Sequence, residues 1–128
     1  MEPKLIWANL ASIDLERTTQ FYSELGFTPF GRTEEMTSFY FSQHKFVINF
    51  FPIANMETFT KSKMVNLENE VIFSISAESK EEVDQWYKKV KQAGGTIYAE
   101  PEPYQDGYTF GFADPDGHKF NFLHWPGM

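Results

Sequence analysis

Apolar and polar positions alternate in the first half of the chain in a pattern that predicts a strand, a helix and three more strands. Residues 5–11 have the period-two alternation of a strand. Asp14 is placed to cap a helix that follows directly, and Gly26 is placed to end it. The further strands are expected at 27–32, 38–42 and 46–51. The first half therefore predicts the order β-α-β-β-β.

The second half repeats this order of elements. Residues 71–76 alternate like a strand, and Ser79 with Glu82 forms the S-x-x-E pattern that starts a helix. The pair Gly94-Gly95 is expected to end that helix. The further strands are expected at 96–100, 108–113 and 119–125.

Short sequence matches between the halves support a tandem repeat. Residues 20–22 (QFY) correspond to 85–87 (QWY), and residues 44–46 (HKF) recur at 118–120 (HKF). Two matches in the same order are stronger evidence of a repeat than either one alone. The stretch between the halves has room for one short helix. We predict a single domain over 1–128, made of module one at 1–54, a linker at 55–68 and module two at 69–128.

Composition narrows the class of protein. Fourteen Phe, six Tyr and three Trp residues are enough to fill the core of one domain of 128 residues. The absence of cysteine excludes disulfides, cysteine-ligated metal sites and a thiolate nucleophile. A formal net charge of −7 argues against a nucleic-acid partner, because such binding depends on neutralising phosphates. The sequence has neither a signal-peptide pattern nor a membrane-spanning apolar run, so we expect a cytoplasmic protein without a membrane partner.

The two sides of the predicted strands differ in polarity. One side is apolar and is expected to lie under a helix; it holds Ile6, Ala8, Leu10, Phe46, Ile48, Phe50, Val71, Phe73 and Ile75. The other side mixes aromatic, aliphatic, amide and hydroxyl groups. Its members are Trp7, Asn9, Val47, Asn49, Phe51, Ile72, Ser74, Ser76, Asn121, Leu123 and Trp125. These mixed sides either line a shared concavity or face bulk water.

Two motifs carry a resemblance to a known superfamily. Residues 9–27 read NLASIDLERTTQFYSELGF, and residues 112–118 read FADPDGH. They resemble the opening and closing motifs of vicinal oxygen chelate proteins, the superfamily of glyoxalase I, extradiol dioxygenases, fosfomycin-resistance enzymes and bleomycin-resistance proteins. The chain looks closest to the glyoxalase-like branch labelled as predicted lactoylglutathione lyases. The resemblance implies an α+β fold of two tandem βαβββ modules forming a U-shaped cleft, commonly assembled as a homodimer.

The resemblance also implies where the metalloenzymes of the superfamily hold a divalent metal ion with His and Glu side chains. Those positions fall on Trp7, Ile72, Asn121 and either Val47 or Asn49. None of these residues is an imidazole or a carboxylate, which a borderline or hard divalent ion prefers. Metal-dependent isomerase or dioxygenase chemistry at the usual site is therefore not expected, and we assign no metal, cofactor or catalytic residue.

The remaining ionisable groups suggest structural roles. Asp114 and Asp116 suit the D-P-D-G turn, in which Asp caps backbone N–H groups and Gly supplies a positive φ. The three histidines are His44 and His118 in turns and His124 on the same strand side as Phe120 and Phe122. A relocated metal site that combines Glu70 with a histidine is left open.

These observations lead to a metal-free protein that binds a small, largely neutral organic molecule in the cleft between the modules. The expected ligand-binding residues are Trp7, Asn9, Asn49, Phe51, Ser74, Tyr108 and Asn121. Tyr108 is included because it flanks the Gln105-Asp106-Gly107 segment, which is either a mobile loop or a simple hairpin. The alternatives are a divalent-metal-dependent lyase or dioxygenase with a relocated metal site, and a protein-interaction module.

Overall fold

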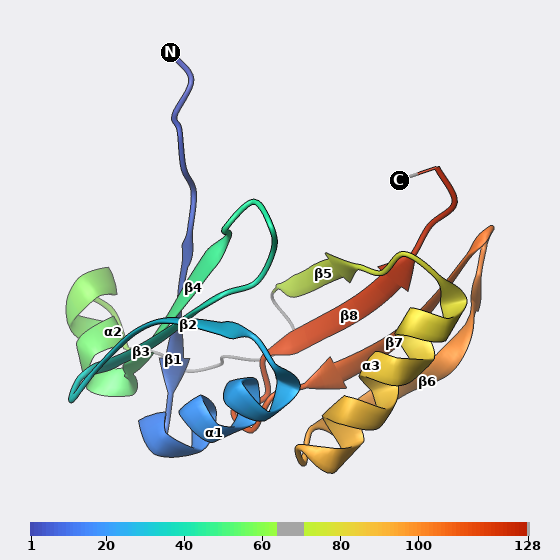
Figure 1. The fold of residues 1–128 in the computed structure, drawn as a ribbon. Coiled ribbons are helices and arrows are strands. Elements are labelled where there is room, and N and C mark those ends of the chain that lie inside the picture. Colours follow the sequence, from blue (N-terminus) through green and yellow to red (C-terminus); the bar gives the residue numbers. More distant parts are fainter. Residues whose placement is uncertain (64–70, 128) are drawn as a thin grey trace. The chain divides into compact units, whose positions relative to one another are not determined.

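The computed structural model describes residues 1–63 and 71–127. The chain divides into two compact units, residues 1–66 and 67–128, which are described separately. In each unit the elements follow the chain order β-α-β-β-β, and the four strands form one sheet (Figure 1). The first unit has an additional helix after its last strand. The expected α+β fold of two tandem modules is confirmed. Among the described residues, no helix is both long and apolar enough to cross a membrane.

The elements of the first unit are β1 (Ala8–Ser12), α1 (Leu15–Leu25), β2 (Thr28–Thr33), β3 (Met36–Tyr40), β4 (Val47–Pro52) and α2 (Ile53–Thr60). Those of the second unit are β5 (Ile72–Ser76), α3 (Lys80–Gln92), β6 (Thr96–Tyr104), β7 (Gly107–Ala113) and β8 (Lys119–His124). The predicted short helix between the halves is confirmed as α2.

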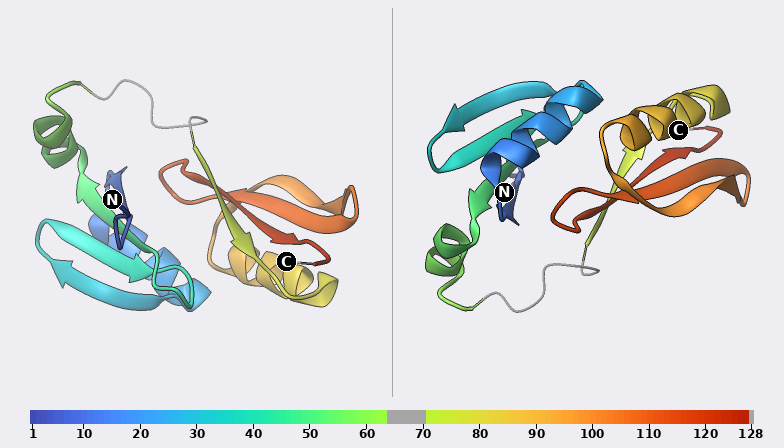
Figure 2. Two further views of the ribbon diagram at one scale, coloured as in Figure 1. Left: turned by 90° about the horizontal axis from the view of Figure 1, so that it is seen from above. Right: turned by 90° about the horizontal axis from the view of Figure 1, so that it is seen from below.

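The first sheet has the strand order β1-β4-β3-β2, with β1 parallel to β4 and the other neighbours antiparallel. Helix α1 lies along one face of this sheet (Figure 2). Tyr22 of α1 is fully buried, and its ring centroid lies 4.9 Å from that of Phe50 and 5.7 Å from that of Phe39. The apolar side of β4 therefore faces the helix, as its alternation predicts.

The ends of α1 follow the predicted signals. Asp14 has an extended backbone, and its side chain accepts a hydrogen bond from the N–H of Arg17. Gly26 ends the helix with a φ of 94°, a left-handed conformation that favours glycine.

The first predicted strand begins later than expected. Residues 5–7 precede β1, and Ile6 is 79% exposed, so the prediction that Ile6 lies under the helix was wrong. The register explains the difference. Ala8 pairs with Ile48, so Ile6, two residues earlier, would need Phe46 as its partner, and Phe46 precedes β4.

The second sheet has the strand order β5-β8-β7-β6, again with one parallel pair, β5 and β8. Helix α3 covers one face of this sheet (Figure 2). The Trp86 ring stacks on that of Phe122, with 4.4 Å between the ring centroids. Phe112 stacks on Phe120 at 5.3 Å in the same buried layer. The capping function of Ser79 is confirmed, because its hydroxyl accepts from the Glu82 N–H at 3.0 Å.

β6 extends four residues beyond its predicted end at residue 100. Pro101 and Pro103 argue against a strand, because proline cannot donate to a neighbouring strand. β6 is an edge strand with irregular register, however, and the edge tolerates both prolines. Tyr104 pairs with Gly107, so the open choice between loop and hairpin resolves to a hairpin with a two-residue turn.

The D-P-D-G turn has the predicted structure. Asp114 is 2% exposed, and its Oδ1 accepts hydrogen bonds from the N–H groups of Asp116 and His118 at 3.0 and 2.9 Å. Gly117 has a φ of 92°, as the turn requires. The turn therefore depends on a buried acceptor.

Candidate functional site

A chain of hydrogen-bonded polar side chains crosses the face of the first sheet that is opposite α1. The Ser38 hydroxyl donates to Asn49 Oδ1 at 2.6 Å, and Asn49 Nδ2 donates to Asn9 Oδ1 at 3.0 Å. The three residues come from β3, β4 and β1, and they are direct partners in the strand register. These bonds fix the orientation of the Asn49 amide.

A small pocket lies on the same face, beside this chain. Its volume is about 230 Å³. Its lining is mostly apolar, with one amide and one ammonium group: Leu5, Ile6, Trp7, Phe30, Lys45, Val47 and Asn49. Trp7 and Phe30 are each 55% exposed, so their rings are available to a ligand. The pocket brings together two of the predicted ligand-binding residues, Trp7 and Asn49, and places Asn9 one hydrogen bond away.

Phe51 also belongs to this face but is less available. Its ring meets that of Phe59 in α2 edge to face at 5.1 Å, and Phe51 is half-buried. It therefore packs against α2 and does not line the pocket.

The corresponding face of the second sheet holds Ser74 and Asn121. They are partners in the register of β5 and β8, as Asn9 and Asn49 are in β1 and β4. The β7 partner of Asn121 is Gly111, whereas the β3 partner of Asn49 is Ser38. Without a hydroxyl at that place, the buried Asn121 Oδ1 has no hydrogen-bond partner in the described part of the chain.

The ring of Tyr98 occupies the space above Gly111. A Cβ atom at position 111 would lie 2.4 Å from the Tyr98 ring, and the Tyr98 hydroxyl donates to the Phe120 carbonyl at 3.1 Å. Partial burial raises the pKa of the Tyr98 hydroxyl above its ordinary value. Position 111 therefore requires glycine for space.

We expect Gly111→Ala to lower the free energy of unfolding by about 1–2 kcal/mol, because the new methyl group must displace the Tyr98 ring. Denaturation in urea measures the loss. In a Tyr98→Ala background the same change should have a much smaller effect, and an equal effect in both backgrounds would contradict this account.

Tyr108 lies away from the other predicted residues. Its hydroxyl donates to Asp84 Oδ1 of α3 at 3.0 Å, so the side chain is on the helix-covered side of the sheet. Burial and the adjacent carboxylate of Asp84 raise the pKa of Tyr108. The structure thus separates Tyr108 from Ser74 and Asn121 within the second unit.

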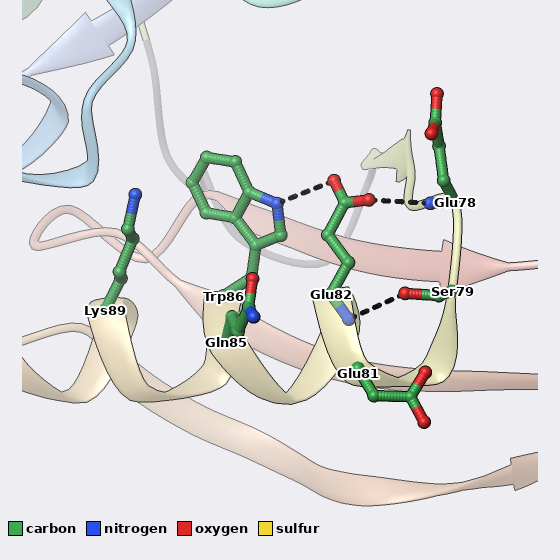
Figure 3. A pocket seen from close by; sticks show the side chains of 7 residues that line it. All are labelled: Glu78, Ser79, Glu81, Glu82, Gln85, Trp86 and Lys89. Atoms are coloured by element: carbon green, nitrogen blue, oxygen red, sulfur yellow. Dashed lines mark hydrogen bonds between the residues drawn. The ribbon is translucent and has the colours of Figure 1, made fainter.

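A larger groove of about 550 Å³ lies at the start of α3 (Figure 3). The Trp86 side chain rises from the helix between Glu82 and Lys89, and Lys89 Nζ lies 5.0 Å from the centre of its ring. The Glu82 carboxylate accepts from the Glu78 backbone N–H at 2.8 Å and from Trp86 Nε1 at 3.4 Å. Glu82 therefore serves to close the helix N-terminus, where a carboxylate also suits the helix dipole.

Comparison with known proteins identifies the family. Residues 4–122 match the Glyoxalase/Bleomycin resistance protein/Dioxygenase superfamily. The chain belongs to this superfamily. The expected resemblance is confirmed at that level, and no curated protein matches the chain.

Several solved structures have a similar fold. A hypothetical protein from S. aureus, SA1046, is 33% identical and has a TM-score of 0.87, with 98% of this chain and 96% of that chain covered. A glyoxalase-related enzyme from Fulvimarina pelagi is 21% identical with a TM-score of 0.86, and the match covers 97% and 90% of the chains. A lactoylglutathione lyase from Agrobacterium tumefaciens is 17% identical with a TM-score of 0.69, and both chains are covered completely.

The superfamily's metal positions do not fit a divalent ion in this chain. Trp7 and Ile72 offer no oxygen or imidazole ligand, and Asn49 offers only a neutral amide oxygen, which already accepts a hydrogen bond from Ser38. The Asn121 oxygen alone cannot replace an anionic ligand set. Within residues 1–63 and 71–127, no three or more His, Asp or Glu side chains are grouped to hold a metal ion. The suggested relocated ligand Glu70 lies outside the described residues.

The histidines occupy structural positions. His118 lies at the D-P-D-G turn, as predicted, and is buried there. His124 Nδ1 lies 3.3 Å from the Ala77 carbonyl oxygen, within hydrogen-bonding distance. His44 is exposed in the turn between β3 and β4.

Five lining residues of the first-unit pocket were not among the predicted ligand-binding set: Leu5, Ile6, Phe30, Lys45 and Val47. Phe30 reaches the pocket because the register of β2 against β3 shifts between Pro29 and Gly31. Strand alternation alone could not reveal that shift. Lys45 could have been found, since it lies two residues before Val47 and lines the same pocket as Val47 and Asn49.

Proposed function

We propose that this protein binds a small organic molecule without a metal ion, and that the first-unit pocket is part of the binding site. One observation carries the proposal: the pocket combines two exposed aromatic rings with an amide group whose orientation is fixed by hydrogen bonds. Such a combination is typical of ligand sites, in which apolar area provides affinity and a few polar groups provide orientation.

Two aromatic side chains provide the apolar contact. Trp7 and Phe30 are exposed by more than half, and a ligand ring would cover surface that otherwise contacts water. The Asn49 amide retains one N–H and one oxygen lone pair beyond its bonds to Ser38 and Asn9. It can therefore bind a carbonyl or a hydroxyl group.

The second unit holds two further predicted ligand-binding residues that the structure does not contradict. Ser74 and Asn121 remain predicted ligand contacts, and the unpartnered Asn121 oxygen supports this assignment. The homodimer and the cytoplasmic location also remain predictions.

Metal content tests the metal-free part of the proposal. Untagged protein purified without chelators is expected to contain zinc, nickel, manganese and iron far below one equivalent, measured by inductively coupled plasma mass spectrometry. One equivalent of any of these metals, retained through gel filtration, would refute this part.

Ligand binding is tested with phenylacetamide, a neutral single-ring amide. We expect it to shift the ¹H–¹⁵N resonances of Asn49 and the indole resonance of Trp7, with the same dissociation constant in the presence of EDTA. Trp7→Ala should weaken binding at least about tenfold, which corresponds to about 1.4 kcal/mol. Because Trp7 is exposed, its loss should leave the melting temperature nearly unchanged.

A matched control is Tyr104→Ala, which removes an exposed aromatic ring from the second unit. This variant should bind phenylacetamide as the unmodified protein does. Absence of any resonance shift, or equal weakening by both substitutions, would count against the pocket.

A further inference from the structure

Lys45 ends the turn between β3 and β4 with an unusual backbone. Its N–H donates to the Ser42 carbonyl at 2.9 Å, and its φ is 62°, in the left-handed region. Residues other than glycine and asparagine rarely adopt this conformation, because the Cβ atom crowds the backbone. Glycine would form this turn with less strain.

Backbone conformation alone does not assign a function to a lysine. Lys61 has nearly the same φ, 57°, at the end of α2, and it lines no described pocket. The difference is where the Lys45 side chain lies. It forms part of the pocket wall, and its Nζ is 5.8 Å from the centre of the Tyr40 ring.

The ammonium group of Lys45 is available to an anion. In the described part of the chain it forms no ion pair, and its contact with the half-buried Tyr40 ring is a weak one. The contact is further ordered by Phe30, which meets Tyr40 edge to face at 5.0 Å. The protein as a whole carries a net charge of −7, and the positive charge of Lys45 beside an apolar pocket is opposite in sign to it.

We propose that the ligand of this pocket is a small organic acid, with its apolar body between Trp7 and Phe30 and its carboxylate against Lys45 Nζ. This inference rests on the proposed function. It adds a negative charge to the ligand, which the sequence predicts to be largely neutral. The remaining wall of Leu5, Ile6 and Val47 suits an aromatic ring or a short aliphatic chain.

Two features select a carboxylate over a phosphate. A phosphate dianion is usually held by several donors, such as an arginine fork or the N–H groups of a helix start. This pocket offers one ammonium group and one amide. Its volume of about 230 Å³ is below the range of roughly 300–1,000 Å³ for drug-sized ligands, which favours a single-ring or short-chain acid.

The test compares phenylacetate with phenylacetamide, which have nearly the same shape and differ in charge. At low ionic strength and pH 7, the protein should bind phenylacetate about fivefold to tenfold more tightly, measured by ¹H–¹⁵N titration. Lys45→Met should abolish this preference, so that the variant binds phenylacetate and phenylacetamide with equal dissociation constants. The preference should also decline with added salt, because the ion pair is exposed to solvent.

Glycine variants provide matched controls for the backbone. Lys45→Gly and Lys61→Gly should each raise the melting temperature by about 2–5 °C, because each relieves the same left-handed conformation. Only Lys45→Gly should remove the preference for phenylacetate.

The outcomes separate the two proposals. Equal binding of the acid and the amide, or a preference that survives Lys45→Met, overturns the inference and leaves the proposed function in place. Failure of both probes to bind at millimolar concentration overturns both.

Discussion

Replacing Asp114 by alanine is expected to lower the free energy of unfolding by about 3 kcal/mol. The Asp114 side chain is 2% exposed and accepts hydrogen bonds from the backbone N–H groups of Asp116 and His118. Its removal leaves donors without their acceptor in a buried turn, at about 1–3 kcal/mol for each buried unsatisfied group. Urea unfolding followed by circular dichroism measures the loss.

Asp114→Asn is the matched control, because the amide oxygen can still accept at the Oδ1 position. We expect it to cost clearly less than alanine, since only the charge assistance of the two bonds is reduced. An asparagine variant as unstable as the alanine variant would show that the negative charge of Asp114, and not its two hydrogen bonds to backbone N–H groups, dominates its role.

Much of the fold follows from local signals that act over a few residues. The N-caps Asp14 and Ser79 and the left-handed Gly26 are found where the sequence predicts them. They can be predicted because each satisfies backbone groups of its own helix end, whatever lies around it. Strand alternation predicts the helix-covered face of β4, as the burial of Ile48 and Phe50 shows. It was wrong for Ile6 and for Val71, which precedes β5 and is 50% exposed.

Predictions of strand boundaries failed where the extent of a strand depends on its partner strand. Ile6 alternates correctly with Ala8, yet β1 cannot include it, because the paired strand β4 begins too late. The two prolines of β6 argue against a strand, yet an edge position accommodates them. Neither the register nor the edge position is encoded within the segment itself.

The polar residues of the candidate site in the first unit could be predicted from the sequence, but the other side chains that belong to it or lie away from it could not. Asn9 and Asn49 share a strand face by alternation, and they do form a hydrogen bond. The contribution of Phe30 depends on a register shift, and Tyr108 belongs to the opposite face through its bond to Asp84. Both depend on tertiary contacts that the local pattern does not contain.

The same substitution at equivalent positions of the two modules is expected to have opposite effects on stability. Asn49→Leu should lower the free energy of unfolding by about 2–3 kcal/mol, because it removes the acceptor of the fully buried Ser38 hydroxyl and the donor to Asn9. Asn121→Leu should leave it unchanged or raise it by up to about 1 kcal/mol, because an unpartnered buried oxygen is replaced by an apolar group. Urea unfolding of both variants at pH 7 provides the comparison.

A double variant tests the cause of the Asn49 loss. Ser38→Ala combined with Asn49→Leu removes both hydrogen-bonding partners, so much of the loss in the single variant should be recovered. A loss at Asn121 as large as that at Asn49 would mean that the Asn121 oxygen has a stabilising partner in solution. If Asn121→Leu is instead neutral or stabilising, the amide is not required for folding, and its retention beside Ser74 is better explained by contact with a ligand.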